Sequence, residues 1–173
     1  MTVVGFISDT HNHLPEEAKD RLRGCERSLH AGDIGEPPIL WELETIAPVN
    51  AVLGNNDHSD FGPSAHAVAD VLIDGVRFVM VHEPAHLSAA LQQAAASHPE
   101  STAPIVAVYG HKHVPALRRG EAGDGYELLL SPGSVFRSRE ELGRRTVGKA
   151  EVRDGAILRA WIEDLDGNVL TEA

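Results

Sequence analysis

The chain has 173 residues, a length at which one hydrophobic core forms readily, so we expect a single domain over residues 1–173. Hydrophobic residues make up 42% and charged residues 24%, which excludes a disordered chain and a membrane-embedded one. The net charge of -11 disfavours stable nucleic-acid binding, because phosphate backbones would be repelled, and it is compatible with a site that collects cations.

Cysteine usage and the N-terminal segment bear on the compartment. Cys25 is the only cysteine, so the chain has no internal disulfide framework and no thiolate metal cluster. Residues 2–8 lack a basic leader, and no apolar run reaches the length of a membrane span. We therefore expect a cytoplasmic protein without membrane contact; a homo-oligomer stays open.

Short apolar runs alternate with helical patterns through the first two thirds of the chain, which predicts a largely parallel central sheet. Prolines are expected to open two helices, at Pro15 and at Pro37-Pro38, and Trp41 is expected to pack against the core. Asp74-Gly75 is typical of a tight hairpin turn. The predicted strands are 2–7, 28–31, 49–53, 71–73, 76–81 and 105–109, with a third helix over about 85–97.

The last third of the chain has a different pattern. Residues 126–130, 146–153 and 156–163 are strand-like, and Asp154-Gly155 and Asp166-Gly167 supply turns, so an antiparallel meander is predicted. Two packed mixed sheets flanked by helices accommodate both halves. The expected fold class is therefore α/β, as a layered α/β/β/α sandwich.

Five predicted strands each end in residue types that bind metals. Open α/β sheets place their sites at these carboxyl ends. A single Asp or Asn after a strand is more often a turn former, but five in succession indicate a metal centre. Oxygen and imidazole ligands suit Mn, Fe, Ni, Zn or Mg, and a shared carboxylate could hold two such ions. The residues are Asp9, His11, Asp33, Asn55, His82, His111 and His113.

The order and local sequence of these residues resemble the signature of the calcineurin-like metallophosphoesterase superfamily. The motifs are Asp9-Thr10-His11, Gly32-Asp33, Gly54-Asn55-Asn56-Asp57, His82 and Gly110-His111-Lys112-His113. Within this superfamily the pattern is most similar to small phosphodiesterases related to the retromer scaffold subunit. Residues 131–134 (Ser-Pro-Gly-Ser) resemble the turn that follows their histidine motif.

The resemblance implies a function and a role for each residue. Asp9, His11 and His113 would bind one divalent ion, Asn55, His82 and His111 the other, and Asp33 would bridge them; Asp33, Asn55 and His82 are also counted as catalytic. Manganese is the first choice for both ions, and a hydroxide between them would attack a small phosphate ester, with a phosphodiester favoured. Asp57 would orient the loop around Asn55.

The sequence departs from the family pattern at three places. Asn12 replaces a usual glycine, Glu83-Pro84 follows His82 where glycine and histidine are common, and Asn56 stands where many larger relatives have a histidine acid. Arg137 and Arg139 are candidates for holding a substrate's anionic group. Three histidines near the motifs are candidate acids or substrate contacts (His13, His58, His86), and three are expected to be structural or solvent-facing (His30, His66, His98).

Two alternatives are weighed against this interpretation. The pair His11-x-His13 also occurs in polymerase-and-histidinol-phosphatase-type barrels and amidohydrolases, but a complete (β/α)₈ barrel takes about 250 residues and leaves the other motifs unexplained. The second alternative is a protein-interaction scaffold that keeps the fold with a vestigial metal site. The presence of every expected ligand type favours the enzyme.

Overall fold

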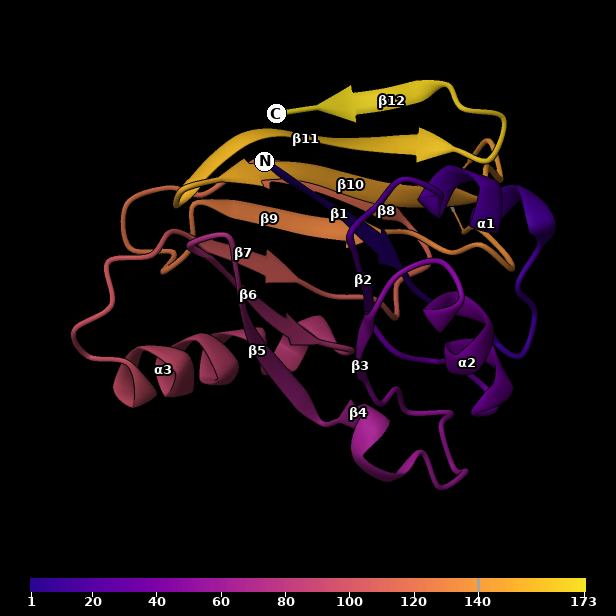
Figure 1. The fold of residues 1–173 in the computed structure, drawn as a ribbon, viewed down its shortest axis with the longest axis horizontal. Coiled ribbons are helices and arrows are strands. Elements are labelled where there is room, and N and C mark those ends of the chain that lie inside the picture. Colours follow the sequence, from indigo (N-terminus) through magenta and orange to yellow (C-terminus); the bar gives the residue numbers. More distant parts are fainter. Residues whose placement is uncertain (140) are drawn as a thin grey trace.

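Two β-sheets packed face to face form the centre of the molecule in the computed structural model, which describes residues 1–139 and 141–173 (Figure 1). The larger sheet has the order β12-β11-β10-β1-β2-β3-β4. Neighbours from β1 to β4 are parallel, whereas β10 to β12 form an antiparallel meander that pairs with β1. Its strands are β1 (Thr2–Ile7), β2 (Arg27–His30), β3 (Val49–Val52), β4 (Ala65–His66), β10 (Thr146–Arg153), β11 (Ala156–Asp164) and β12 (Val169–Glu172).

The smaller sheet has the order β5-β6-β7-β9-β8. Its inner strands β6, β7 and β9 are parallel, and the edge strands β5 and β8 are antiparallel to their neighbours. At the β5–β6 turn, Asp74 and Gly75 both have positive φ, 48° and 80°, as the predicted tight hairpin requires. The strands are β5 (Val68–Ile73), β6 (Val76–Val81), β7 (Ile105–Val108), β8 (Pro115–Arg119) and β9 (Leu128–Pro132).

Helices cover the outer face of each sheet. Buried side chains of α1 (Glu16–Leu22) and α2 (Pro38–Glu44) pack with Ile7 and Ala51 of the larger sheet. The α3 helix (Leu87–Ser97) packs with Val79 and Val81 of the smaller sheet. Two short 3₁₀ turns, Gly62–Ser64 and Pro84–His86, complete the helical elements of the described residues.

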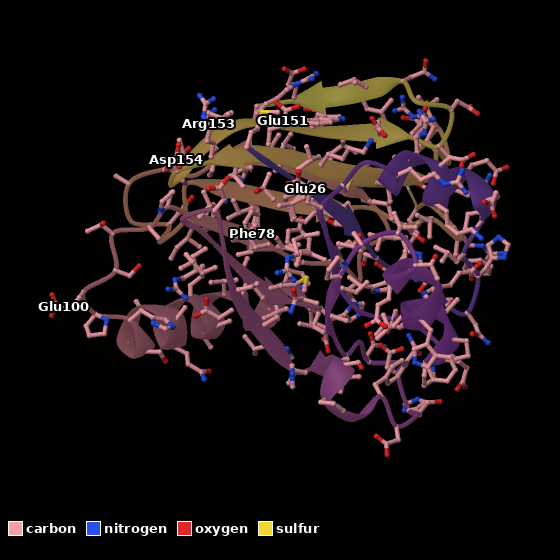
Figure 2. The ribbon with its side chains drawn as sticks, in the orientation of Figure 1. Glu26, Phe78, Glu100, Glu151, Arg153 and Asp154 are labelled. Carbon is pink, nitrogen blue, oxygen red and sulfur yellow. The ribbon has the colours of Figure 1, made fainter. Side chains whose placement is uncertain are left out.

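The main core lies between the sheets. Phe6 of β1 and Phe78 of β6 are fully buried there, with ring centroids 5.8 Å apart, and Phe78 is seen among the side chains between the two layers (Figure 2). Complete burial of two such rings removes a large apolar area from water and fixes the sheets against each other. The predicted α/β/β/α sandwich is confirmed.

Some local predictions were wrong. The strand expected at 126–130 is β9, which pairs in parallel with β7 because Leu128 and Leu130 face the core between the sheets, so it is not part of the meander. Strands β4, β8 and β12 were not predicted. Trp41 is 63% exposed, because the short α2 helix buries Ile39, Leu40 and Leu43 instead.

Among the described residues, no helix has the length and apolar character needed to cross a membrane.

Candidate metal centre

The loops that follow β1, β2, β3, β6 and β7 converge at one end of the sandwich. Backbone hydrogen bonds join them: Asp9 N donates to Gly32 O over 2.9 Å, and His11 N donates to Asp33 O over 2.9 Å. Gly110 N donates to His82 O over 3.0 Å, which links the two loops of the smaller sheet. Loops tied to rigid strands in this way hold their side chains in defined positions.

One group of side chains brings together Asp9, His11, Asp33 and His113, whose candidate ligand atoms all lie within 4.8 Å of one another. The Nε2 atoms of His11 and His113 are 3.2 Å apart. His113 Nε2 also lies 3.1 Å from Asp9 Oδ1, and His11 Nε2 lies 3.6 Å from Asp33 Oδ2. Two imidazoles and two carboxylates around one point can bind a divalent cation.

A second group lies on the other side of Asp33. Asn55 Oδ1 is 3.1 Å from His82 Nε2 and 3.1 Å from His111 Nδ1. Asp33 Oδ1 is 3.4 Å from His82 Nε2, whereas Asp33 Oδ2 faces His11. The two carboxylate oxygens of Asp33 therefore face different groups of ligand atoms. All seven residues singled out in the sequence are brought together.

Backbone carbonyls fix the protonation of two of these histidines. Because a carbonyl oxygen only accepts hydrogen bonds, His82 Nδ1 donates to Ala31 O over 2.7 Å, and His113 Nδ1 donates to Arg137 O over 2.7 Å. In each neutral ring the Nε2 atom then keeps its lone pair and faces the other candidate ligands. A hydrogen bond to the second ring nitrogen is the usual support of a metal-binding histidine.

One buried oxygen tests whether metal ions fit. Asp9 is fully buried, and its Oδ1 accepts no hydrogen bond from the described residues although His113 Nε2 is only 3.1 Å away. Its Oδ2, by contrast, accepts hydrogen bonds from Ser8 Oγ and from His111 N. A buried carboxylate oxygen without a donor is costly unless a cation compensates it, so the donor set fits a metal ion.

Electrostatics keep the shared carboxylate charged. Burial alone would raise the pKa of Asp33, but interaction with the protonated form of His82 and hydrogen bonds from Asn56 hold it well below its usual range. Burial likewise opposes the charged form of His82, yet in that form the ring can donate to both Asp33 and the Ala31 carbonyl, which raises the pKa of this imidazole above its ordinary value. An ionised Asp33 is the form that can bind cations.

Two glycines of the motifs are required by close approach. A Cβ atom on Gly54 would lie 2.1 Å from Asp33 Oδ1, and one on Gly110 would lie 2.1 Å from Ser8 Oγ and 2.5 Å from Ala31 O. Any side chain at either position would push a candidate ligand loop away. The Gly-Asn and Gly-His pairs thus have a steric explanation beyond turn preference.

The backbone at the site is unusual. Five of the seven candidate ligands have positive φ, a left-handed conformation that is uncommon for residues other than glycine. The values are 54° for Asp9, 44° for His11, 53° for Asp33, 69° for His111 and 58° for His113. These conformations turn the chain sharply after β1, β2 and β7 and direct the side chains toward one another.

Supporting residues lie around the candidate ligands. Asp57 accepts hydrogen bonds from Gly54 N over 2.7 Å and from Gly35 N over 2.9 Å, and so braces the loop that carries Asn55. His30 is fully buried; its Nδ1 accepts from Gly32 N over 3.2 Å and its Nε2 lies 3.0 Å from Thr10 Oγ1. Burial lowers the pKa of His30 to about 4, so the ring is neutral.

Sequence comparison agrees with this geometry. Residues 1–155 match the family model described as the calcineurin-like phosphoesterase superfamily domain. The chain belongs to the calcineurin-like phosphoesterase superfamily. It is 36% identical over 137 residues to a probable metallophosphoesterase of Methanothermobacter thermautotrophicus, an alignment that covers 76% of each protein.

Solved structures show the same fold. Vps29 of Entamoeba histolytica, in a complex with Zn²⁺, has a TM-score of 0.73 and 20% identity, and the match covers 99% of this chain and 98% of that one. A novel archaeal phosphodiesterase has a TM-score of 0.66 and 23% identity, with coverage of 94% and 100%. At this level of identity the likeness concerns the superfamily fold.

A cavity of about 280 Å³ opens over the candidate metal centre. It is lined by five of the candidate ligands and by four further residues: Asn56, Phe136, Arg137 and Arg139. The two arginines were expected near an anionic substrate, and Asn56 lies at the predicted loop. Phe136 was not singled out, because a lone phenylalanine after a turn carries no chemical signal in the sequence.

The remaining histidines are placed differently. His13 is exposed, and its ring centroid lies 5.8 Å from that of Phe136. His58 and His86 are also exposed, and neither is among the described residues that line the cavity. His98 is paired with Asp70 at 3.5 Å, and His66 is exposed on β4. The buried contact of His30 with Thr10 was not foreseen in detail, although a structural role was expected.

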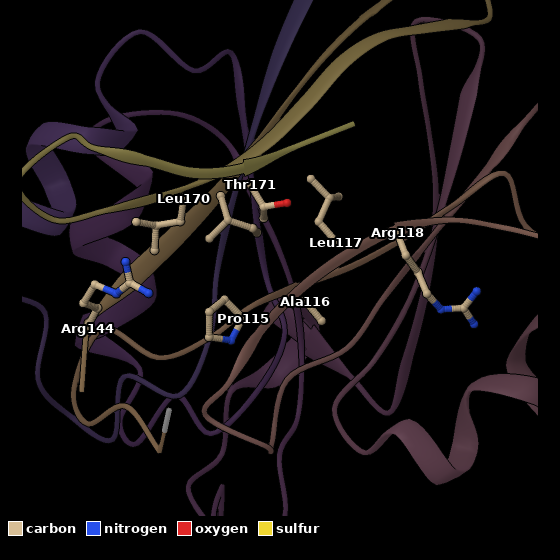
Figure 3. A pocket seen from close by; sticks show the side chains of 8 residues that line it. Pro115, Ala116, Leu117, Arg118, Arg144, Leu170 and Thr171 are labelled. Atoms are coloured by element: carbon tan, nitrogen blue, oxygen red, sulfur yellow. The ribbon is translucent and has the colours of Figure 1, made fainter. Parts of the chain in front are cut away.

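A second hollow, of about 370 Å³, lies between β8 and the β11–β12 edge (Figure 3). Its lining includes Pro115, Leu117 and Leu170, whereas the side chain of Arg118 points away from these residues and pairs with Asp124. None of the seven candidate ligands lines it. The candidate metal ligands line the smaller cavity instead.

Proposed function

We propose that this single-domain calcineurin-like protein is a dinuclear metal-dependent phosphodiesterase. Asp9, His11 and His113 hold one divalent ion, Asn55, His82 and His111 hold the other, and Asp33 is shared between them. The observation that carries this proposal is the placement of the two Asp33 oxygens, one toward each group. Manganese is our first choice of ion, with Fe, Ni, Zn and Mg also compatible with oxygen and imidazole donors.

Two such ions supply a nucleophilic water of lowered pKa and neutralise the negative charge of the phosphate. The side chains of the protein hold the candidate ligand atoms in place. His82 and His113 are held by the carbonyls of Ala31 and Arg137, so their Nε2 atoms face the centre without rearrangement. Asp33 stays ionised and keeps both oxygens directed inward, which costs no reorganisation when a substrate binds.

A diester is favoured over a monoester because the archaeal structural neighbour is described as a phosphodiesterase. We also propose a cytoplasmic location, because a single buried cysteine without a disulfide partner suits a reducing compartment.

The decisive experiment compares two synthetic substrates on defined metal. The protein is stripped with a chelator, reconstituted with Mn²⁺ and assayed on bis-p-nitrophenyl phosphate and p-nitrophenyl phosphate. We expect metal-dependent turnover with higher kcat/KM on the diester. Absence of metal-dependent turnover on both substrates would overturn the proposal.

The alternative is a protein-interaction scaffold, and the likeness to Vps29 over 99% of the chain is the observation that favours it. A scaffold with a vestigial site would lack turnover whether or not ions bind. Metal content measured together with turnover on the diester separates the two functions.

A further inference from the structure

The segment after β9 is hydrogen-bonded to two of the candidate ligands, Asp9 and His113. Ser134 Oγ donates to Asp9 O over 2.9 Å and accepts from the backbone N–H groups of Phe136 and Arg137. Arg137 O accepts from the His113 ring, and Arg139 N donates to His113 O over 2.9 Å. The backbone of this segment is therefore fixed relative to the candidate ligands. Its side chains have defined positions at the site, unlike those of a free surface loop.

Phe136 leaves an aromatic surface open beside the metal centre. Its side chain is 45% exposed, and its ring centroid lies 5.8 Å from that of His11 and 5.8 Å from that of His13. An exposed phenylalanine gives up the stability that burial would provide, and here it has only a partial contact with two imidazoles. A flat ring of a ligand would find an apolar surface at this position.

Two positive charges stand next to that ring in a strongly acidic protein. Arg137 and Arg139 are exposed, line the cavity and form no ion pair within residues 1–139 and 141–173, whereas Arg23, Arg77 and Arg159 are each paired with a carboxylate. Two guanidinium groups present donors that match a phosphate or carboxylate in a fixed geometry. Both arginines line the same cavity as the candidate ligands, and because metal ions there would take the scissile phosphate, the pair is available for a second anionic group.

We propose that Phe136, Arg137 and Arg139 form a recognition subsite for the non-reacting part of the substrate, which carries a flat ring and a second anionic group. The inference rests on the proposed phosphodiesterase function and deepens it. The substrate class it identifies is a nucleotide-like phosphodiester: one phosphate is cleaved at the metal centre, the heterocycle packs on Phe136, and a second phosphate binds the arginine pair.

Three substrates with the same leaving group test this directly: methyl p-nitrophenyl phosphate, thymidine 5′-(p-nitrophenyl phosphate), and the latter with a 3′-phosphate. Because p-nitrophenolate departs in each case, ratios of kcat/KM report recognition alone. We expect kcat/KM to increase at both steps. The 3′-phosphate step should be about ten-fold or more, as is typical of hydrogen bonds to a charged group.

The variants separate the two parts of the subsite. Phe136→Leu should abolish the gain from thymidine, and Arg137→Gln with Arg139→Gln should abolish the gain from the 3′-phosphate. The control is Arg153→Gln, an exposed arginine that lies where β10 pairs with the start of β1, at the opposite end of the sheet from Asp9 (Figure 2). It should leave all three ratios at their parent values.

A binding measurement distinguishes failure of the subsite from failure of the phosphodiesterase proposal. Calorimetry with thymidine 3′,5′-bisphosphate and thymidine 5′-phosphate on the Mn²⁺-loaded protein should show tighter binding of the bisphosphate, and the difference should be lost in the double arginine variant. If the esters are hydrolysed but the ratios stay near one, the subsite is overturned while the function stands. If nothing is hydrolysed but the arginine-dependent difference remains, the phosphodiesterase proposal fails and the subsite stands as a binding site.

Discussion

The side-chain amide of Asn56 donates a hydrogen bond to Asp33 Oδ2 over 2.7 Å, while its backbone N–H donates to Asp33 Oδ1 over 2.9 Å. By the family resemblance, this residue stands where many larger relatives have a histidine acid. It is directed at the shared carboxylate, and an amide does not release a proton to a leaving group. Asn56 is thus a positioning residue for Asp33.

The first prediction follows from that contact. General acid catalysis typically contributes about 10² to 10⁴ in rate, so without it the departing alkoxide depends on metal or water for stabilisation. We expect kcat/KM to fall steeply as the leaving-group pKa rises across a series of aryl and alkyl diesters. The measurement is that series on the parent and on Asn56→His.

A nearly flat dependence in the parent would contradict this expectation and mean that another residue supplies the proton. His58→Ala would then be assayed on the alkyl esters. A collapse of their rate would identify His58, and an unchanged rate would direct attention to His13 and His86.

The second prediction concerns metal content. Seven ligand-type side chains in two groups that share Asp33 should hold close to two divalent ions per chain after chelation and reconstitution with Mn²⁺. Elemental analysis against protein concentration measures the ratio. Fewer than one ion per chain would rule out the dinuclear arrangement.

The third prediction tests the shared carboxylate. Asp33→Asn keeps the shape but removes the charge that faces both groups. Loss of an outer partner of a metal ligand already costs about 10- to 100-fold, so we expect a larger loss of kcat/KM here, together with loss of bound Mn²⁺. The matched control is Glu121→Gln, at an exposed acid in the loop between β8 and β9. Near-normal turnover and metal content in Asp33→Asn would show that the bridge is misassigned.

The fourth prediction concerns the dependence of folding stability on pH. Burial lowers the pKa of His30 from 6.5 to about 4, so in mildly acidic solution the unfolded chain binds a proton that the folded chain does not. The contribution of His30 to stability should therefore fall as pH drops through 6.5 toward 4. By pH 5 the contribution of His30 to this loss reaches about 2 kcal/mol.

Urea unfolding of the metal-free protein at pH 7.5, 6 and 5 measures this effect, and the range lies above the ordinary pKa of the carboxylates. His30→Gln should flatten the acid loss even if it lowers stability at pH 7.5. His66→Gln, at an exposed histidine of β4, should reproduce the parent profile. An identical slope in the parent and in His30→Gln would show that the acid sensitivity has another origin.

Much of the fold could be predicted because the βαβ rhythm and the Asp-Gly turns are local features. The meander was predicted too long, since nothing in residues 126–130 tells whether a strand joins β10 or β7; that choice depends on the core between the sheets. Trp41 was misplaced because its neighbours Ile39, Leu40 and Leu43 fill the buried face of a seven-residue helix.

The candidate site could be predicted even though its residues are far apart in the sequence. Each candidate ligand lies in the loop after a strand, and the carboxyl ends of parallel strands meet at one edge of a sheet. The sequence could not reveal that Phe136 stands beside His11, since the two are brought together by tertiary contacts such as that of Ser134 with Asp9. Nor could it show that Asn56 faces Asp33 rather than a leaving group, because loop geometry decides where an amide points.

The left-handed backbone lowers the stability of the fold at five candidate ligands: Asp9, His11, Asp33, His111 and His113. A protein that served only as a structural scaffold would have no need of residues other than glycine in this conformation. Each such residue costs of order 1 kcal/mol or more relative to glycine, and stability is generally sacrificed at functional positions. A lineage that needed only the shape could relieve part of this torsional penalty with glycine at His11 and His111, the two of the five that are not buried. Keeping imidazoles at these two positions maintains a conformational cost that only a bound ligand would offset.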